Sequence, residues 1–311
     1  MVHWDPAPRG FSERDQAWGY ARSGFASLVL GRDGQCVPAS TTVDPPGLCG
    51  RAFFRRAPTG TDKHERDGDV DRTDGRGPRD LRPLTLEMGV NQHAEGSCLI
   101  AVGATRVLAT ASVEDRVPPF LRGKGQGWVH AEYAMLPRAT HQRTPRESVR
   151  GRLQGRTMEI QRLIGRALRA AVHLDRLGEK SYTIDVDVLQ ADGGTRTAGL
   201  TAGFAALLMA LERESHPKPP VRDWLAAVSV GLASGEVWLD LDYQEDSQID
   251  VDLNLVMTKR HRLVEVQGSA EHAWFDRRQL DAVLDVAEAG IDALIGAVEQ
   301  ALPAAGRLVG G

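Results

Sequence analysis

Cysteines are few in this 311-residue chain, and long apolar runs are absent. Cys36, Cys49 and Cys98 follow no regular spacing, so they form neither a disulfide framework nor a zinc motif. No apolar stretch approaches the ~20 residues that cross a bilayer, and the first residues lack the apolar core of a signal peptide. These absences argue against a secreted disulfide-rich module or a membrane protein. They predict a soluble, cytoplasmic protein in a reducing compartment.

The first part of the chain also lacks regular hydrophobic periodicity. Residues 1–61 carry scattered aromatics and Pro-Gly clusters, and Val70 is the only aliphatic residue between Asp62 and Asp80. Such a composition buries too little apolar surface to offset its ordering entropy. We therefore predict that residues 1–73 are an N-terminal extension without stable structure. An alternative hypothesis is a start-site artefact, with translation beginning at Val70; the intact mass of the native protein would decide.

Clear periodicity begins after residue 80 and alternates between the strand and helix types. Strands joined by the turn Gly103-Ala104 come first, and a hairpin through Ser234-Gly235 comes later. The pattern predicts an α/β (α+β) domain over residues 74–305, followed by a flexible tail over 306–311. The predicted helices cover about 158–177, 197–214 and 277–302, and further strands cover 181–189, 252–258 and 263–269.

Two arginines stand at predicted helix starts, each after glycine: Arg156 in QGRTMEI and Arg196 in DGGTRTAG. A helix N-terminus offers free backbone N–H groups and partial positive charge, and arginine adds a planar fork that suits phosphate. Gly194 allows close approach of the backbone, and Thr195 adds a hydroxyl donor. Together they favour an oxyanion site. For either loop alone, a plain strand-to-helix turn is an equally good explanation.

Charge is unevenly distributed along the domain. Between Arg138 and Arg169 there are nine arginines and two acids, which indicates a polyanionic partner rather than a mixed-charge solvated surface. The segment LPRATHQRTPRESVRGR, where this run begins, contains Pro137 and Pro145 and is loop-like, which suits a flexible RNA. Trp128 and Tyr133 nearby can stack on bases, although core packing is the role that we favour for them.

An acidic segment, GEVWLDLDYQEDSQIDVD, holds seven carboxylates and no basic residue. Strand alternation predicts Asp240 and Asp242 on one face, with Asp246 and Asp252 flanking the turn into the next strand. Oxygen ligands of this kind suit Mg²⁺ or Mn²⁺. The alternatives are a solvated acidic hairpin, or carboxylates paired with the arginine cluster between Arg138 and Arg169.

These strings resemble the ribonuclease PH family of phosphorolytic exoribonucleases over about three-quarters of the chain. The resemblance rests on colinear segments from DGRGPRDLRP through GQGWVHAEYAMLPRATHQRTPRES, GRTMEIQRLIGRALRAAV and DVDVLQADGGTRTA to DLDYQEDSQIDVDLN and EVQGSAE. It implies the mixed sheets and packed helices of that fold, similar to the second domain of ribosomal protein S5. The family's proteins start close to the DGR motif, so most of residues 1–73 have no counterpart in it.

The resemblance also implies roles for individual residues. It places the phosphate site on Arg156, Gly194, Thr195 and Arg196, with the two arginines counted as catalytic. The metal-associated, catalytic aspartates fall on Asp246 and Asp252, with Mg²⁺ or Mn²⁺ as cofactor. The RNA-contacting basic loop falls on Arg138, Arg143 and Arg146.

The implied activity is 3′-to-5′ trimming of tRNA precursors, and of rRNA as a further substrate. Inorganic phosphate is the co-substrate, nucleoside 5′-diphosphates are released, and the reaction is reversible as nucleotide addition. The implied assembly is a homohexamer, a trimer of dimers. Three alternatives remain open at this point: a non-catalytic RNA-binding ring subunit, a metal-dependent hydrolytic ribonuclease and a plain RNA-binding module.

Overall fold

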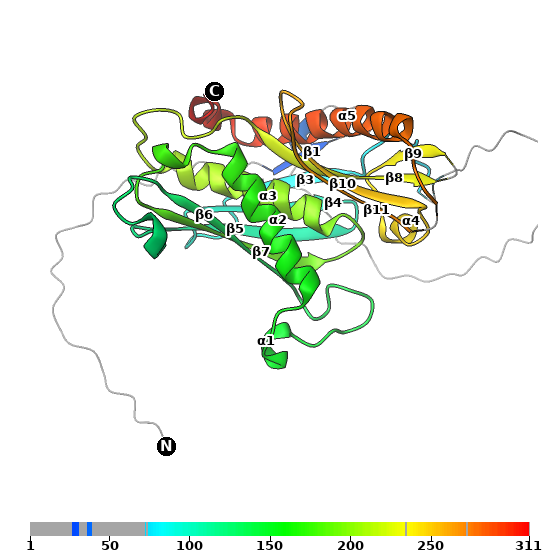
Figure 1. Cartoon of the computed structure of the whole chain (residues 1–311), viewed down its shortest axis with the longest axis horizontal. Helices are drawn as coiled ribbons and strands as arrows, with labels where there is room; N and C mark the ends of the chain where they lie inside the picture. The colour runs from blue at the N-terminus through cyan, green and yellow to red at the C-terminus, as the bar shows by residue number, and fades with distance from the viewer. Residues whose placement is uncertain are drawn as a thin grey trace, which may run out of the picture.

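The computed structural model describes residues 27–30, 36–38, 72, 74–233, 235–271 and 273–310. Two sheets, one of seven strands and one of four, pack with long helices into a mixed α/β fold, which confirms the predicted fold class (Figure 1). No described helix is both long and apolar enough to cross a membrane.

The larger sheet has the strand order β2-β1-β3-β4-β5-β7-β6. Its neighbouring strands are antiparallel, except that β6 and β7 run parallel. The turn at Gly103 joins β4 and β5 as predicted, with Val102 opposite Thr105. The strand bounds are Ser27–Leu30 (β1), Cys36–Pro38 (β2), Leu84–Met88 (β3), Gly96–Val102 (β4), Thr105–Glu114 (β5), Trp128–Met135 (β6) and Ser181–Gln190 (β7).

The smaller sheet is antiparallel, in the order β11-β10-β8-β9. Its strands are Leu225–Ala233 (β8), Glu236–Leu239 (β9), Val251–Thr258 (β10) and Leu263–Ala270 (β11). Between β9 and β10 lies the short helix α4, Tyr243–Asp246. Strand β9 stops at Leu239, so the strand alternation predicted through Asp242 does not occur.

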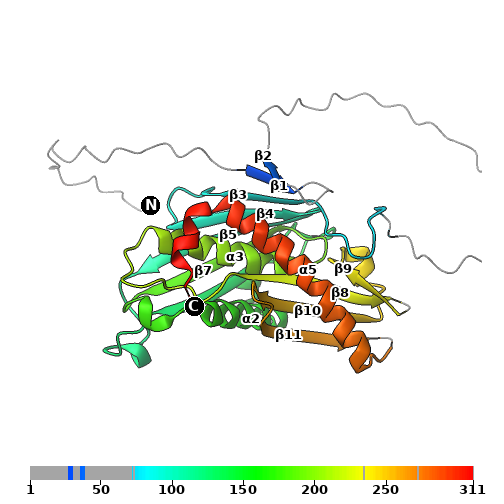
Figure 2. The same cartoon turned by 90° about the horizontal axis from the view of Figure 1, so that it is seen from above.

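Three long helices cover and join the sheets: α2 (Gly155–Ala171), α3 (Thr195–Glu212) and α5 (Arg277–Ala301). Helix α3 contacts β4, β5 and β7 of the larger sheet and β8 and β10 of the smaller one. It is therefore buried on nearly all sides, which explains why its sequence is mostly apolar. Helix α2 turns one apolar face to the core, and α5 lies across both sheets (Figure 2).

The chain ends differ from the sequence-based expectation. Two short strands, β1 and β2, occur within residues 1–73 and extend the larger sheet beyond β3, although no strand was predicted there (Figure 2). Arg72 is also buried in the domain, at 3% exposure. The other residues up to 71 lie outside the described residues. Residues 306–310, expected to form a flexible tail, pack instead through the 3₁₀ helix Pro303–Leu308 and bond to Val221.

Gly96 marks the closest approach between α3 and the larger sheet. A Cβ atom added there would lie 2.0 Å from the carbonyl oxygen of Ala206 on α3. We expect Gly96→Ala to reduce the free energy of unfolding by about 1–3 kcal/mol or more, because the helix must move away from the sheet. Urea unfolding measures this. Gly296 on α5 has nothing within 4 Å of an added Cβ, so Gly296→Ala should be neutral or stabilising.

Candidate active site

The turn between β7 and α3 carries one of the predicted oxyanion loops. Gly193 and Gly194 both adopt positive φ, 74° and 65°, and α3 starts at Thr195 with Arg196 as its second residue. The first-turn amides of an α-helix have no carbonyl partner inside the helix. The predicted geometry, a glycine turn at a helix N-terminus, is therefore confirmed. We call residues 192–196 the glycine loop.

The second predicted oxyanion position is the start of α2. The helix begins at Gly155, and Arg156 is its second residue, exposed to solvent. Glu147 stabilises this end: its carboxylate accepts hydrogen bonds from the amide of Gln154, at 3.2 Å, and from the hydroxyl of Thr157, at 2.6 Å. The helix therefore starts where the sequence predicts. The hydrogen bonds from Gln154 and Thr157 to Glu147, which stabilise this start, are not predicted by the sequence.

Arg196 is held between α2 and the smaller sheet. Its Nη1 donates to the side-chain oxygen of Gln267 on β11 and lies 3.5 Å from the carboxylate of Glu159 on α2. Gln267 in turn donates to Glu159 at 2.6 Å. Because both partners are fixed by other elements, the guanidinium has a defined orientation before any ligand binds.

Thr195 is paired with a buried tyrosine. The hydroxyl of Tyr133 on β6 donates to Thr195 Oγ1 at 3.0 Å, and Tyr133 is 3% exposed. Burial raises the pKa of Tyr133, and the hydrogen bond to Thr195 and the charges of Arg156 and Arg196 lower it. Since Thr195 accepts from Tyr133, its own proton is free to be donated to a ligand.

The two predicted aspartates lie on different elements and share one electrostatic environment. Asp246 ends α4 and is exposed, whereas Asp252 is partly buried in β10. Desolvation raises the pKa of Asp252 to about 6; Asp246 also raises it, and Arg196 and Arg156 lower it. Desolvation likewise raises the pKa of Asp246, against the effect of the same two arginines. The structure therefore brings both helix starts and both aspartates together.

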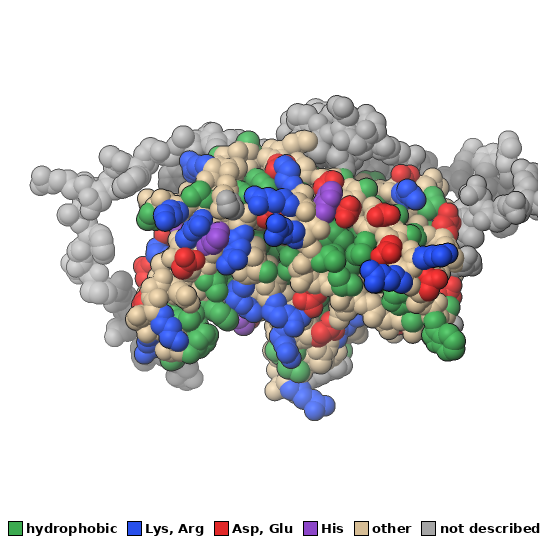
Figure 3. Space-filling view, turned by 45° about the horizontal axis from the view of Figure 1, so that its top comes forward, with side chains coloured by type: hydrophobic (Ala, Val, Ile, Leu, Met, Phe, Trp, Pro, Cys, Tyr) green, Lys and Arg blue, Asp and Glu red, His purple; other side chains and the backbone are tan. Residues whose placement is uncertain are grey.

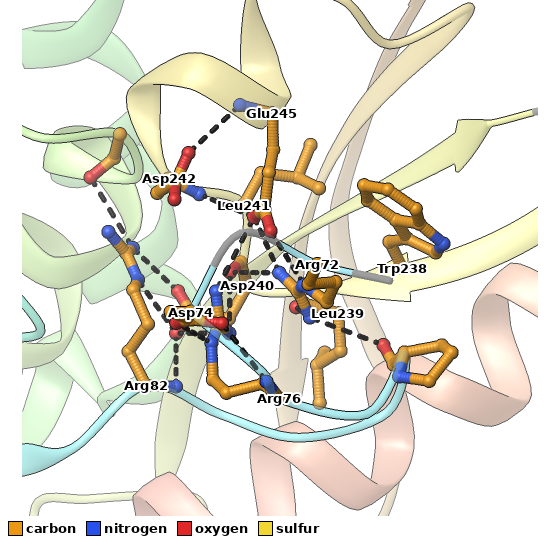
Figure 4. Close-up of polar contacts among 12 residues, drawn as sticks. Arg72, Asp74, Arg76, Arg82, Trp238, Leu239, Asp240, Leu241, Asp242 and Glu245 are labelled. Carbon is orange, nitrogen blue, oxygen red and sulfur yellow. Dashed lines mark hydrogen bonds and ion pairs between the residues drawn. The ribbon is translucent and has the colours of Figure 1, made fainter. Parts of the chain in front are cut away.

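The other acidic residues of the segment have structural roles. Asp240 adopts φ 54° directly after β9 and forms a bidentate ion pair with Arg82. Asp242 caps α4, and Glu245 accepts two hydrogen bonds from Arg72. The expectation that Asp240 and Asp242 share a strand face is therefore wrong. Asp240 and Glu245 do pair with arginines, but with Arg82 and Arg72 rather than with the arginine cluster between Arg138 and Arg169 (Figure 4).

The predicted basic loop projects beside these groups. Arg138, Arg143 and Arg146 are all exposed, and Figure 3 shows basic side chains on the projection that carries α1 (Glu147–Arg150). The base of the loop is fixed by a hydrogen bond from the Thr144 amide to the Pro137 carbonyl, 2.9 Å. The Ala191 amide, just before the glycine loop, donates to the Ala139 carbonyl at 2.8 Å, so the basic loop adjoins the glycine loop.

The run of nine arginines does not form one surface. Arg166 pairs with Glu265 of β11 at 2.6 Å. Arg169 packs over the ring of Trp128 and donates to the Val129 carbonyl. Trp128 also packs against Phe120, so it has the packing role that we favoured over base stacking. Arg156 and Arg162 on α2 are exposed as well, so the exposed arginines of the run lie both in the loop and on α2.

Several residues around the site carried no local sequence signal. For Tyr133 the sequence favours core packing over base stacking and gives no sign of its contact with Thr195, and Glu159 and Gln267 occur in ordinary amphipathic patterns. Arg82 and Thr105 lie more than 80 residues before the glycine loop, and both form hydrogen bonds with it. The sheet order β3-β4-β5-β7 brings Arg82 and Thr105 to the glycine loop.

Comparison with known proteins agrees with this fold. Residues 80–211 match domain 1 of the 3′ exoribonuclease family, and residues 223–290 match domain 2 of the same family. Ribonuclease PH from Exiguobacterium sibiricum is 56% identical over 243 residues, covering 77% of this chain and 97% of the relative. Ribonuclease PH from Bacillus cereus is 55% identical over 236 residues, covering 74% of this chain and 96% of the relative.

Solved structures show the same fold at lower identity. Rice Rrp46 aligns with a TM-score of 0.62 and 20% identity, over 74% of this chain and all of that one. The Archaeoglobus fulgidus exosome with RNA bound to the active site aligns with a TM-score of 0.61 and 24% identity. That alignment covers 71% of this chain and 90% of the other.

Fold and matching domains together define a 3′ exoribonuclease. More specifically, the chain belongs to the ribonuclease PH family. It is a phosphorolytic 3′-to-5′ exoribonuclease of the tRNA nucleotidyltransferase type, and inorganic phosphate is its co-substrate.

Proposed function

We propose that this protein trims the 3′ ends of tRNA precursors, with rRNA as a further substrate, at the site formed by the glycine loop, the start of α2 and the aspartates. The attacking phosphate is held by Arg156, Arg196, Thr195 and the Gly194 backbone. The observation that carries this proposal is a chain of contacts between the two helix starts and Asp252. Arg196 contacts Glu159 on α2, the helix that carries Arg156 in its first turn, and it bonds to Gln267. Gln267 lies opposite Asn254, which donates a hydrogen bond to Asp252.

The reaction follows from these groups. An oxygen of inorganic phosphate attacks the phosphorus of the last phosphodiester, opposite the 3′ oxygen of the shortened chain, which leaves. The product is a nucleoside 5′-diphosphate. The chain's contribution is to orient the attacking anion and to stabilise the charge that builds up around phosphorus. Because a phosphodiester is exchanged for a phosphoanhydride, the step runs in reverse when diphosphates are abundant.

Asp246 and Asp252 fit a divalent cation. Oδ1 of Asp252 is buried and has no hydrogen-bond partner within the described part of the chain. No group of three or more His, Cys, Asp or Glu side chains that could hold a metal occurs among the described residues. Two carboxylates suit Mg²⁺ or Mn²⁺, which keep several waters and bind through one or two carboxylates plus phosphate. Such an ion would offset negative charge on the scissile phosphate.

The basic loop is proposed to bind the tRNA backbone, and the ring is proposed to be a homohexamer, a trimer of dimers. Arg138 and Arg143 are exposed, with no ion-pair partner among the described residues, so they are available to phosphates.

The hexamer has a separate basis in exposed apolar side chains. Around the start of α2, assembly would cover Val149, Leu153 and Met158. Light scattering tests the hexamer.

One experiment tests the proposed substrate and site together. A tRNA precursor with 3′ extra nucleotides is incubated with and without inorganic phosphate, and the released nucleotide is identified. We expect phosphate-dependent shortening with nucleoside diphosphates as product. Monophosphates released without phosphate would indicate a hydrolase in which the glycine loop only clamps substrate. Binding without shortening would indicate a non-catalytic RNA-binding subunit.

The basic loop makes a separate prediction about RNA. Replacing Arg138, Arg143 and Arg146 together with alanine should weaken tRNA binding. It should also make the slope of log affinity against log salt shallower by about 2, since each phosphate contact contributes ~0.7 on single strands. The phosphate KM should not change. Filter binding at several salt concentrations measures the slope.

The control removes the same charge elsewhere, at three exposed arginines outside the loop: Arg116, Arg122 and Arg307. An equal loss of salt dependence in both triple variants would mean that net charge, rather than the loop, attracts the RNA.

A further inference from the structure

The glycine loop is held from behind by two buried residues outside the proposed phosphate contacts. Thr105, at the start of β5 and 0% exposed, donates its hydroxyl to the Gly193 carbonyl at 2.7 Å. The same hydroxyl accepts from the Asp192 amide at 2.9 Å. Arg82 Nη1 donates to the Asp192 carbonyl. The carbonyl groups of Asp192 and Gly193 are therefore both held on the side of the loop that faces Thr105 and Arg82.

Arg82 holds a second segment at the same time. Its Nη2 lies 2.7 Å from Asp240 Oδ1, and its Nε and its own backbone amide donate to Asp240 Oδ2 at 3.0 and 2.8 Å. Figure 4 shows Arg82 reaching Asp240 directly ahead of Leu241 and Asp242, which lead into α4. Asp246, the proposed catalytic aspartate, ends that helix.

The loop and the α4 segment are also in direct contact. A Cβ atom on Gly193 would lie 2.4 Å from the Leu241 carbonyl oxygen and 2.6 Å from the Asp242 carbonyl carbon. Arg82 thus joins two backbones that already touch. These are the backbone of the glycine loop and the backbone that carries Asp246.

Stability alone is a weak reason for this arrangement. Arg82 and Asp240 are 4% and 5% exposed, and a buried ion pair is often no more stabilising than an apolar pair of the same volume. Its specific effect is geometric, because every hydrogen bond fixes a direction. Second-sphere contacts of this kind typically decide whether a site reaches its productive geometry.

We propose that Arg82 and Thr105 are positioning residues for phosphorolysis. They hold the Asp192 and Gly193 carbonyls on their own side of the glycine loop and leave the Gly194 and Thr195 amides available to phosphate, and Arg82 fixes that loop relative to Asp246. This inference rests on the proposed phosphate site. It predicts that removing either residue weakens phosphate binding without weakening RNA binding.

Thr105→Val is the sharper test, since it keeps shape and charge and removes only the two hydrogen bonds. We expect the phosphate KM to rise about tenfold to a hundredfold, as for small misplacements of a binding group, with the RNA KM unchanged. The phosphate-induced shift in melting temperature should shrink in parallel. Arg82→Gln should act in the same direction and also lower kcat, because Asp246 loses its tie to the loop.

Thr201→Val is the matched control. Thr201 is 1% exposed on α3 and also makes two hydrogen bonds, to the Thr197 carbonyl and from the Ala227 amide. It should lower the melting temperature comparably and leave the phosphate KM unchanged.

The outcomes separate the possibilities. An unchanged phosphate KM in a folded Thr105→Val protein, or equal changes in Thr105→Val and Thr201→Val, would overturn the inference. If Arg82→Gln does not fold, Thr105→Val decides alone. Arg196→Ala is assayed in parallel: if that variant also keeps its phosphate KM, the proposed phosphate site itself is wrong. If only Arg196→Ala loses phosphate, the site stands and the positioning role falls.

Discussion

Replacing Arg196 with alanine is expected to lower kcat/KM by about 10²–10³-fold, the usual loss when a preorganised group that stabilises developing charge is removed. Arg196 is the second residue of α3, and its guanidinium is oriented by Gln267 and Glu159 before phosphate arrives. Its charge also acts on both Asp246 and Asp252. In steady-state assays at saturating RNA the loss should appear as a lower kcat, from the lost charge stabilisation, together with a higher phosphate KM, because Arg196 also binds the attacking phosphate.

Arg196→Lys should recover only part of the activity, because lysine keeps the charge but lacks the planar fork that holds phosphate and Gln267 together. The matched control is Arg166→Ala. Arg166 also reaches from a helix to β11, where it pairs with Glu265, but this pair is largely exposed and contributes about 0–1 kcal/mol. Arg166→Ala should therefore retain activity. A rise in RNA KM alone for Arg196→Ala would assign the arginine to the RNA backbone.

Long elements with strong periodicity could be predicted from the sequence. The apolar positions of α2 and α3 and the alternation in β7 have one reasonable interpretation each, and the structure contains all three elements. The two Gly-Arg helix starts were also identified from physical arguments alone, because glycine before a helix and arginine in its first turn are local signals. Their convergence on one site came from the resemblance, since periodicity says nothing about distance.

The acidic segment could not be predicted in the same way. Local alternation favoured a strand through Asp242, yet β9 stops at Leu239 because Asp240 turns back to Arg82, 158 residues earlier in the chain. Glu245 is likewise buried against Arg72. Arg72 lies near the end of residues 1–73, for which the composition predicted no stable structure. Such long-range ion pairs override the local strand propensity, and the residues next to them in the sequence do not predict them.

Asp252→Asn should abolish most of the activity, with a fall in kcat of about 10²–10⁴-fold, the range for loss of a positioned acid or base. The substitution is nearly isosteric. Asn254 donates a 3.1 Å hydrogen bond to Asp252 in the unmodified protein, and the side-chain oxygen of asparagine can still accept it. The fold and the phosphate KM should therefore change little. What is lost is the negative charge at a buried Oδ1 that has no other partner in the described chain.

Asp185→Asn is the control, because Asp185 is also a half-buried strand aspartate whose pKa is raised first by desolvation, and it is none of the residues proposed to bind phosphate, metal or RNA. It should keep full activity. Mn²⁺ binding followed by electron paramagnetic resonance then separates two roles for Asp252. Weaker Mn²⁺ binding in Asp252→Asn identifies a metal ligand, whereas normal binding with lost turnover identifies the donor of the proton to the leaving 3′ oxygen. Normal turnover in this variant would remove Asp252 from the catalytic site and leave Asp246 as the single acidic candidate of this pair.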